Sequence, residues 1–380
     1  MNIELIASCN FGLEAVVKRE IAQLGYKVVK TEDCRVFFQG DNRAIVRSNL
    51  WLRTADKVLL NMGDFEAVTF EELFQQTKAL PWEQLIPPDG NFPVTGSSIR
   101  SVLKSVPSCQ SIIKKAIVER LKEAYMMDTF PEDGPVYKIE FMIMKDKVTI
   151  AVNTSGEGLH KRGYRKAQGP APIKETLAAA MVLLSYWKDD RILLDPCCGS
   201  GTIPIEAALI GRNIPPGINR SFVSQDWDLI DGSVWKEEKA RAFKAMNVKN
   251  PLRIYGYDID KKVLACAMVN AEEAGVSDDI VFRCKDATTL TSKTKNGIII
   301  TNPPYGTRIG SEKSIKKLYD GMKRFFAENP TWSLFMITPD EGVEEAIFQH
   351  PADRRRKLYN GRMKVCYYQF HGKKDTDEAQ

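Results

Sequence analysis

Histidine is scarce in this chain, with three residues among 380, and cysteine is limited to eight scattered residues. There is no Cys-x-x-Cys pair, and no histidine stands next to a cysteine or an acid at the spacing of metal ligands. Structural zinc sites and metal-activated hydrolases need such clusters. We therefore predict no metal site, and we interpret the cysteines as small core residues in a reducing compartment.

Long apolar runs are also absent. No stretch approaches the roughly 18 uninterrupted apolar residues of a membrane span. The start, Met1-Asn-Ile-Glu-Leu, lacks the basic and then apolar layout of a secretory signal. With 43% hydrophobic residues the chain can still bury a sizeable core, and its length suggests two or three domains. We expect an ordered cytoplasmic protein that does not bind membranes.

The net charge of +5 is modest, but the positive charge is concentrated in two segments. Residues 98–122 hold six basic residues and one acid, and residues 158–174 hold five basic residues and no acid. Charge of this kind is typical of a solvated surface and equally of a nucleic-acid contact. The charge pattern alone does not distinguish the two.

The first half of the chain has the pattern of two small α+β units. Its strands and helices are expected at 3–7, 12–24, 34–38, 41–48, 57–62, 69–78, 109–125, 137–144 and 147–153. Glycine and proline between residues 156 and 172 predict a linker. We place the boundaries at 1–64, 65–155, 156–172 and 173–380.

From residue 173 onward, helical segments alternate with short apolar strands, which predicts a doubly wound, mostly parallel sheet. Strands are expected at 192–195, 254–258, 280–283, 298–301 and 332–337. The last two strands, at 356–359 and 365–370 around Asn360-Gly361, are expected to form an antiparallel hairpin at the sheet edge.

The first predicted strand of this sheet runs into a glycine turn, Asp195-Pro-Cys-Cys-Gly-Ser-Gly-Thr202, followed by a helix. Such a turn lets a cofactor approach the backbone at the carboxyl end of a parallel strand. A phosphate loop would need Lys-Ser/Thr after its last glycine, and a dinucleotide fingerprint would need Gly or Ala at Pro204. Neither pattern is present.

Acids follow the next two strands, Asp258 after the second and Asp286 after the third. One can accept hydrogen bonds from ribose hydroxyls and the other from an adenine amino group. Either could be an ordinary loop acid, but the ordered series suits an adenosine that carries no phosphates.

The fourth strand ends in Asn302-Pro303-Pro304-Tyr305. The two prolines make a rigid wall of carbonyl acceptors, Asn302 adds a side-chain oxygen, and Tyr305 offers a flat face. This set fits a planar group bearing an NH2. Guanine N2, adenine N6 and a glutamine amide all meet that description, so the motif leaves them open.

The two motifs together resemble class I methyltransferases that act on amino nitrogens. Further segments, Gly158-Leu-His-Lys-Arg-Gly-Tyr-Arg165, Ala171-Pro-Ile-Lys-Glu-Thr-Leu-Ala-Ala178 and Pro215-Pro-Gly-Ile-Asn-Arg-Ser-Phe222, resemble the THUMP-domain guanine-N2 methyltransferases of bacterial large-subunit ribosomal RNA. The resemblance covers essentially the whole chain. It implies an α/β fold, in which ferredoxin-like and THUMP RNA-binding units precede a Rossmann-like methyltransferase domain with a seven-stranded sheet.

The resemblance also implies roles for individual residues. S-adenosylmethionine would be bound at its methionine end by Asp195, Gly199 and Gly201, at its ribose by Asp258 and at its adenine by Asp286. The remaining expected cofactor contacts are Pro196, Cys197, Thr202, Ile259, Ala287 and Asn302, and the target base would lie on residues 302–305. Because THUMP units of this family bind RNA, candidate RNA contacts are Arg100, Lys104, Lys114, Lys115, Lys161, Arg162 and Arg165.

Other readings of the same residues lead to different functions. Cys197 or Cys198 as a nucleophile would imply pyrimidine C5 methylation, but that cysteine belongs near the loop after the fourth strand, where Tyr305 stands. Adenine N6, guanine N2 of transfer RNA, and a ribosome-assembly factor that binds RNA without catalysis remain alternatives to guanine N2 of 23S ribosomal RNA.

Overall fold

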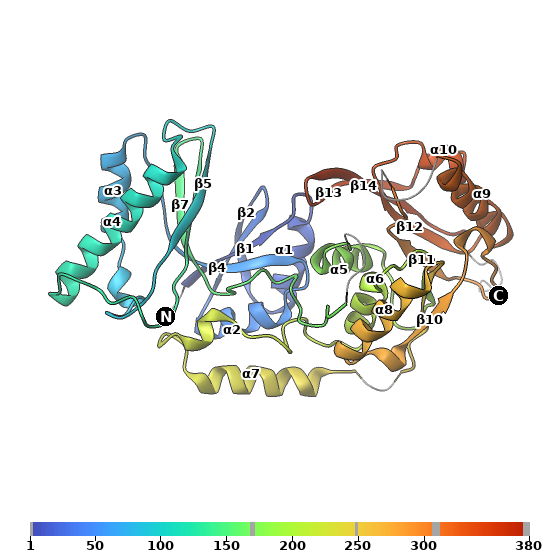
Figure 1. Ribbon diagram of the computed structural model, residues 1–380, viewed down its shortest axis with the longest axis horizontal. Coiled ribbons are helices and arrows are strands. Elements are labelled where there is room, and N and C mark those ends of the chain that lie inside the picture. The colour runs from blue at the N-terminus through green and yellow to red at the C-terminus, as the bar shows by residue number, and fades with distance from the viewer. Residues whose placement is uncertain (1–2, 168–171, 248–249, 306–311, 375–380) are drawn as a thin grey trace. The chain divides into compact units, whose positions relative to one another are not determined.

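The structure is a computed structural model that describes residues 3–167, 172–247, 250–305 and 312–374 (Figure 1). The chain divides into two compact units. Unit 1 comprises Met1–Ser8, Lys18–Leu159 and Ser221–Ala240, and unit 2 comprises Cys9–Val17, His160–Arg220 and Arg241–Gln380. The predicted boundaries divide the chain strictly in sequence order, whereas each compact unit takes in a segment from the other half.

The centre of unit 1 is a seven-stranded sheet with the order β2-β3-β1-β4-β7-β6-β5. Its pairs are antiparallel between β1 and β3, β2 and β3, β4 and β7, and β6 and β7, and parallel between β5 and β6. The strands of the two predicted α+β units thus share one sheet. Its strands are β1 (Ile3–Cys9), β2 (Lys27–Glu32), β3 (Arg35–Gly40), β4 (Ala55–Glu66), β5 (Val94–Ile99), β6 (Ile139–Met144) and β7 (Lys147–Asn153).

Two helices of unit 1 begin at side-chain caps. Asp41 Oδ1 accepts a hydrogen bond from the backbone N–H of Ala44, and Thr69 forms a capping box with Glu72. Helix α3 packs against α4, which in turn packs on β5. The helices of this part of the chain are α1 (Glu14–Gln23), whose residues fall in both units, α2 (Asn42–Trp51), α3 (Phe70–Lys78) and α4 (Val106–Tyr125), with a short 3-10 helix at Trp82–Gln84.

A segment from the second half of the chain, Ser221–Ala240, belongs to unit 1. The Trp227 indole stacks on the Tyr137 ring with 4.9 Å between ring centroids, and its Nε1 donates to the Val136 carbonyl at 3.0 Å. Both rings are buried. The segment contains a 3-10 helix at Val223–Asp226 and leads into α7 (Gly232–Ala245). The core of unit 1 therefore depends on an aromatic residue from much later in the chain, since Trp227 lies 91 positions after the Val136 carbonyl to which it donates.

Unit 2 contains a second seven-stranded sheet, with the order β10-β9-β8-β11-β12-β14-β13. Neighbours from β10 to β12 are parallel, and β14 is antiparallel to both β12 and β13. This confirms the predicted strands and the predicted edge hairpin. The strands are β8 (Leu193–Asp195), β9 (Ile254–Asp258), β10 (Ile280–Cys284), β11 (Ile298–Thr301), β12 (Ser333–Thr338), β13 (Arg354–Asn360) and β14 (Met363–Phe370).

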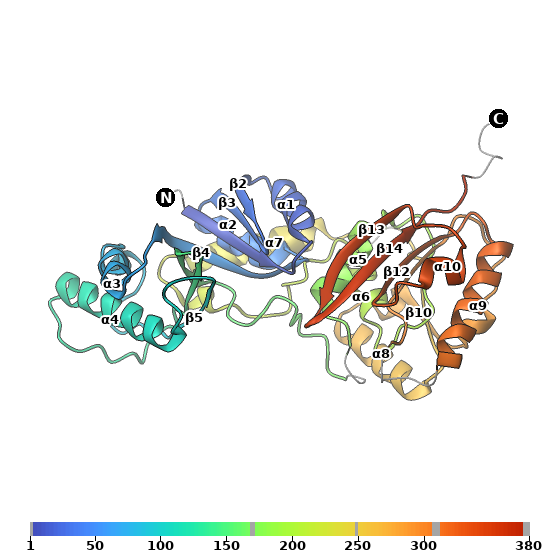
Figure 2. The same ribbon diagram turned by 90° about the horizontal axis from the view of Figure 1, so that it is seen from above.

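Helices cover both faces of this sheet, as Figure 2 shows. Helices α9 and α10 pack on one face, where Met322 and Phe325 of α9 join Ile299, Leu334 and Met336 of the strands in one buried cluster. Helices α5, α6 and α8 form a second layer in which α6 contacts both of the others. The helices of this unit are α5 (Glu175–Leu184), α6 (Thr202–Gly211), α8 (Lys261–Glu273), α9 (Glu312–Glu328) and α10 (Val343–Ile347). This is the doubly wound arrangement predicted from the sequence.

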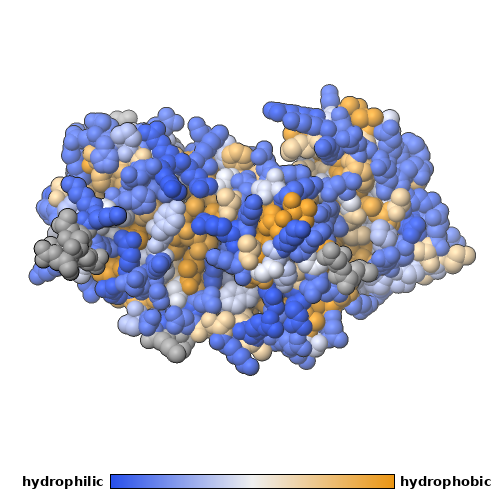
Figure 3. Space-filling view, turned by 180° about the vertical axis from the view of Figure 1, so that it is seen from behind, coloured by the Kyte–Doolittle hydropathy of each residue, from blue (hydrophilic) through white to orange (hydrophobic). Residues whose placement is uncertain are grey.

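The face of the molecule drawn in Figure 3 is mainly hydrophilic, with apolar residues gathered in separate patches. Of the helices that the structure describes, none has both the length and the apolar character needed to span a bilayer.

Candidate functional site

Four parallel strands of unit 2 end at one edge of their sheet. Strands β8, β9 and β11 finish at Asp195, Asp258 and Thr301, and β10 finishes two residues before Asp286. In a doubly wound sheet this carboxyl edge is where ligands bind. The glycine turn, both predicted adenosine acids and the Asn-Pro-Pro-Tyr segment are therefore brought to the same edge.

The glycine turn has a backbone conformation that only glycine adopts without strain. Gly199 and Gly201 have φ angles of +55° and +82°. A Cβ atom on Gly201 would lie 2.9 Å from the Ala267 Cβ of α8. The Gly199 N–H donates to Asp258 Oδ2 at 2.9 Å, which joins the turn to the end of β9. The turn is thus held close to α8 and β9 with its backbone facing the edge.

Asp195, at the start of this turn, is a buried acid with two hydrogen bonds. Its Oδ1 accepts from the Thr301 hydroxyl at 2.8 Å and from the Cys197 N–H at 3.1 Å. Burial raises the pKa of Asp195 to about 7, while these two hydrogen bonds act in the opposite direction. Thr301 directly precedes Asn302, so the hydrogen bond links the predicted cofactor strand to the predicted catalytic strand.

The cysteines of the turn do not have the surroundings of nucleophiles. Burial raises the pKa of the Cys197 and Cys198 thiols well above the ordinary value, and the carboxylates of Asp195 and Asp258 raise both further. A thiolate, the reactive form, is disfavoured under these conditions. The surroundings therefore favour the interpretation of both residues as parts of the turn.

Asp258 and Ile259, which the resemblance predicts as adenosine contacts, lie at the carboxyl end of β9. The two carboxylate oxygens of Asp258 each accept one backbone hydrogen bond, from Gly199 and from Asp260, and each has a lone pair left for a ribose hydroxyl. Ile259 beside it is 70% exposed, although it is large and apolar. Asp286 caps a short 3-10 helix that begins at Ala287, with its Oδ1 accepting from the Thr288 N–H at 2.8 Å.

Two features of the edge test whether the predicted cofactor fits. The Ser200 hydroxyl in the glycine turn is buried and has no hydrogen-bond partner among the described residues. Ile259, next to Asp258, is a large apolar side chain that is exposed, and an apolar ring bound beside Asp258 would cover it. A ligand with a polar acceptor at one end and a flat apolar ring at the other satisfies both, and S-adenosylmethionine is such a ligand. The residues present therefore fit this cofactor.

Asn302 and Tyr305 lie at the same carboxyl edge of the sheet, directly after the end of β11. The Asn302 Oδ1 atom is buried and lacks a hydrogen-bond partner among the residues that the structure describes. Pro303 is buried, whereas Pro304 and Tyr305 are partly exposed. The Tyr305 hydroxyl accepts a 2.8 Å hydrogen bond from Nδ2 of Asn360, the last residue of β13 before the turn of the β13–β14 hairpin. Gly306, the next residue of the motif, lies outside the described residues.

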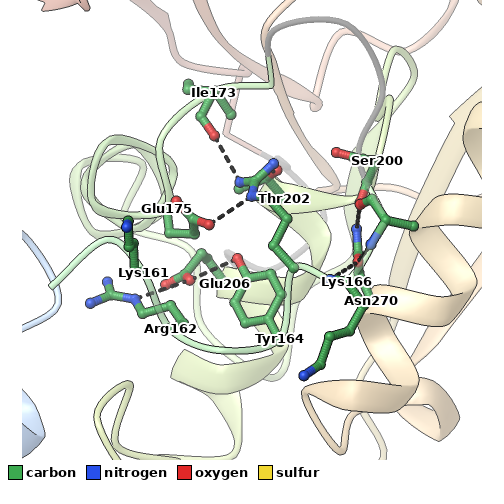
Figure 4. Close-up of polar contacts among 12 residues, drawn as sticks. Lys161, Arg162, Tyr164, Lys166, Ile173, Glu175, Ser200, Thr202, Glu206 and Asn270 are labelled. Carbon is green, nitrogen blue, oxygen red and sulfur yellow. Dashed lines mark hydrogen bonds and ion pairs between the residues drawn. The ribbon is translucent and has the colours of Figure 1, made fainter. Parts of the chain in front are cut away.

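The linker before α5 is attached to the glycine turn by buried polar contacts (Figure 4). Arg165 Nε donates to Glu175 Oε1 at 2.7 Å, and its Nη2 donates to the Thr202 hydroxyl at 3.2 Å. The Arg162 side chain is 2% exposed and lies 3.4 Å from the Glu206 carboxylate. Both arginines were predicted as RNA contacts, but in the structure they face buried carboxylates of α5 and α6. We therefore do not carry them into the proposed RNA-binding set.

Asn270 of α8 joins the same linker to the glycine turn. Its Oδ1 accepts from the backbone N–H groups of Lys166 and Ala167, and its Nδ2 donates to the carbonyls of Ala167 and Ser200 at 2.8 and 3.2 Å. The side chain is 1% exposed. We refer to residues 164–167, held in this way, as the linker strap; residues 168–171 of the predicted linker lie outside the described residues.

The four basic residues predicted in unit 1 differ in exposure. Arg100, Lys104 and Lys115 are exposed. Lys114 is half-buried, with its ammonium 2.6 Å from Glu132 Oε1 and 3.4 Å from the centre of the Phe92 ring. Burial lowers the pKa of Lys114. The prediction for Lys114 is thus weakened by a local role, whereas the other three can meet phosphate without losing a described ion pair.

Sequence reasoning missed Asn270 and Asn360. A signal existed for the arginines: Glu206 interrupts the otherwise apolar helix Thr-Ile-Pro-Ile-Glu-Ala-Ala-Leu-Ile, and a buried acid requires a buried partner. No comparable signal existed for Asn270, which lies in a helix with mixed side chains. Among the described residues, no group of three or more histidines, cysteines or acids is arranged to hold a metal ion.

Comparison with known families gives three matches along the chain. Residues 162–369 match the RMKL-like methyltransferase domain, residues 4–59 match the RlmL ferredoxin-like domain, and residues 67–153 match the THUMP domain. A Bacillus subtilis relative named "Putative RNA methyltransferase YpsC" is 48% identical over 371 residues, which are 97% of this chain and 96% of that protein.

Solved structures of similar proteins cover nearly the whole chain. A "predicted N6-adenine-specific DNA methylase" from Listeria monocytogenes is 48% identical, with a TM-score of 0.93 over 98% of this chain and 97% of that one. SMU.472, "a putative methyltransferase complexed with SAH", is 41% identical, with a TM-score of 0.93 over 99% of both chains.

Proposed function

Since this chain belongs to the RMKL-like methyltransferase family, with ferredoxin-like and THUMP domains before the catalytic one, we propose that it forms N2-methylguanosine in 23S ribosomal RNA in the cytoplasm. Its cofactor is S-adenosylmethionine, as the relative crystallised with the demethylated product indicates. The THUMP domain supports RNA as the partner. The choice of guanine and of the large-subunit RNA is supported only by the resemblance of the sequence to the guanine-N2 methyltransferases of that RNA.

The observation that carries the proposed chemistry is the buried Oδ1 of Asn302, for which the described part of the chain offers no hydrogen-bond partner. A buried carbonyl oxygen without a hydrogen bond is costly, by roughly 1–3 kcal/mol. An exocyclic amino group would remove that cost by donating one hydrogen to Asn302 and the other to the Pro303 carbonyl. With both hydrogens held, the nitrogen lone pair is directed out of the base plane.

The bound cofactor supplies a methyl group on a positively charged sulfur, which is already a good electrophile. Transfer forms a bond from the amino nitrogen to the methyl carbon and breaks the bond from that carbon to sulfur, so the sulfur becomes neutral. The nitrogen then carries the positive charge and loses a proton to water. Asn302 and Pro303 stabilise the developing charge by accepting its hydrogen bonds, and the Tyr305 ring holds the base by stacking. No strong base is needed.

The exposed residues Arg100, Lys104, Lys115 and Lys161 are the cations that we propose to contact RNA phosphates. An amino group in a paired base is reached only after the base leaves the stack, so an unpaired nucleotide is the favoured target. We thus assign these four exposed cations of unit 1 and of the linker to substrate binding.

Adenine N6 is the second candidate, because the Listeria relative is named for that atom and the Asn302 site accepts any planar amine. Transfer of a labelled methyl group to RNA distinguishes guanine N2 from adenine N6. Unmodified transcripts of 23S ribosomal RNA and of transfer RNA are incubated with methyl-labelled S-adenosylmethionine, digested and analysed as nucleosides. We expect labelled N2-methylguanosine from the ribosomal transcript. Labelled N6-methyladenosine would overturn the choice of base, and an unlabelled RNA with cofactor binding intact would overturn RNA as the substrate.

A further inference from the structure

The β13–β14 hairpin of unit 2 is unusually basic. Residues 354–364 contain no acid and six basic residues, which are Arg354, Arg355, Arg356, Lys357, Arg362 and Lys364. β13 is the edge strand of the sheet. Positive charge on an edge strand protects against strand pairing between molecules, so the composition alone has an ordinary explanation.

The topology places the tip of this hairpin at the carboxyl edge of the sheet, where the predicted site residues lie. β13 is antiparallel to β14, β14 is antiparallel to β12, and β12 is parallel to β11. β13 therefore runs in the same direction as β11 and ends at the same edge. The 2.8 Å hydrogen bond from Asn360 Nδ2 to the Tyr305 hydroxyl confirms that the tip touches the predicted target-base segment. Edge protection does not require this contact.

The cations of the hairpin fall into two groups along its length. At the start of β13, far from the tip, Arg354 donates to the Tyr186 hydroxyl, Arg355 pairs with Glu344, and Arg356 donates to the Gly12 carbonyl. Towards the tip, Lys357, Arg362 and Lys364 are exposed. Three exposed cations thus lie towards the tip, the end of the hairpin that contacts Tyr305 through Asn360.

Aromatic side chains accompany these cations. The Tyr359 ring packs edge-on against Phe11 with 6.1 Å between centroids, and Lys357 Nζ lies 5.7 Å from the Tyr359 ring. Lys364 is the cross-strand neighbour of Tyr359. Phe11 is 40% exposed, although it is large and apolar. Exposed aromatic rings among cations are typical of surfaces that bind single-stranded nucleic acid by stacking and by phosphate contacts.

We propose that the tip of the β13–β14 hairpin binds the single-stranded RNA next to the target nucleotide, with Lys357, Arg362 and Lys364 on its phosphates and Tyr359 and Phe11 against a neighbouring base. This inference rests on the proposed RNA substrate. The hydrogen bond from Asn360 then makes the tip a positioning element as well, because it fixes the Tyr305 ring on which the target base stacks.

The test compares two triple variants of the full chain. Lys357→Ala/Arg362→Ala/Lys364→Ala removes the charge at the tip. Arg354→Ala/Lys373→Ala/Lys374→Ala removes the same charge from the opposite end of β13 and from the segment that follows β14. We expect the tip variant to raise the KM for RNA by about tenfold or more and to lower the slope of log KM against log salt by about 2, as for three lost phosphate contacts. The control should stay within about threefold of wild type. The affinity for S-adenosylhomocysteine should be unchanged in both.

The outcomes separate the inference from the proposed function. If the wild-type protein methylates RNA and the tip variant keeps its KM and salt slope, the hairpin does not bind RNA and the inference is wrong. If the wild-type protein methylates no RNA, the proposed function fails first. Arg362→Ala, a single change in the exposed turn, provides the same readout should the triple variant fold poorly, with a loss of about 0.7 in the salt slope. Tyr359→Ala should raise KM, and Tyr359→Phe should restore it.

Discussion

The Thr301 hydroxyl donates a 2.8 Å hydrogen bond to Asp195 Oδ1, so the last residue of β11 and the last residue of β8 share one buried polar contact. Asp195 ends the strand before the glycine turn, and Thr301 precedes Asn302, the residue proposed to hold the target amine. Because burial holds the pKa of Asp195 at about 7, this contact affects how much of the acid is ionised at neutral pH.

Cofactor affinity should therefore depend on pH. S-adenosylmethionine and S-adenosylhomocysteine both carry an ammonium group at this end, which favours the ionised form of Asp195, so the affinity for either should rise as the pH increases towards about 7 and level off above it. Thr301→Val removes a hydrogen bond to the charged form, which should move the midpoint upward by about one pH unit. Thr301→Ser, which keeps the hydroxyl, should match the wild type. Calorimetric titration with S-adenosylhomocysteine from pH 6 to pH 8 provides the measurement; a flat profile would show that Asp195 does not respond to the cofactor.

Asn270 should matter for cofactor binding although it lies behind the glycine turn. Asn270→Ala removes four hydrogen bonds that join the linker strap to Ser200. We expect a loss of roughly 1–3 kcal/mol in the free energy of unfolding and about tenfold weaker binding of S-adenosylhomocysteine. The matched control is Asn329→Ala, whose amide donates to the Phe325 carbonyl far along the chain from the turn. Equal cofactor affinity in the two variants would mean that the strap does not shape the site.

Glu238 should be important for the stability of unit 1. Its side chain is 1% exposed and accepts from Arg43 at 2.9 Å and from Arg47 at 2.9 Å. Removing one partner of a buried ion pair costs roughly 3–5 kcal/mol, and less here because both arginines are partly exposed. Glu237→Ala is the control, since Glu237 also pairs with Arg43 but is 58% exposed. Chemical denaturation should show a clear loss for Glu238→Ala and less than about 0.5 kcal/mol for Glu237→Ala. Equal losses would contradict a structural role for the buried carboxylate.

The parallel strands β8, β9, β11 and β12 of unit 2 were predictable because each is a short, mainly apolar run that ends in a polar residue. Strands β2, Lys27–Glu32, and β5, Val94–Ile99, were not predicted. β2 alternates exposed and half-buried residues, and β5 is mostly threonine, glycine and serine, so neither has the apolar character of a buried strand. β2 takes its place in the sheet by pairing with β3, which follows it in the chain, and β5 by pairing with β6, which lies about 40 residues later.

The positions of the site residues at one edge were also predictable, because the carboxyl ends of parallel strands meet there. The burial of Arg162 and Arg165 was not, since basic residues beside glycines and prolines have the pattern of an exposed loop. Their partners lie 44 and 10 residues further along the chain. The transfer of Ser221–Ala240 to unit 1 likewise depends on contacts such as that of Trp227 with Tyr137, which no local pattern encodes.

The central claim is that Asn302 acts mainly on the target amine, and that the cofactor contact which the resemblance also implies for it contributes little to cofactor affinity. Single-turnover methyl transfer to RNA and calorimetric binding of S-adenosylhomocysteine, measured side by side for wild type and Asn302→Ala, test it most directly. We predict that the variant loses transfer by roughly 10² to 10³ fold, the cost of removing one preorganised polar contact from a transition state, and keeps cofactor affinity within about threefold. Unchanged transfer, or a loss of transfer matched by an equal loss of cofactor affinity, would contradict the claim.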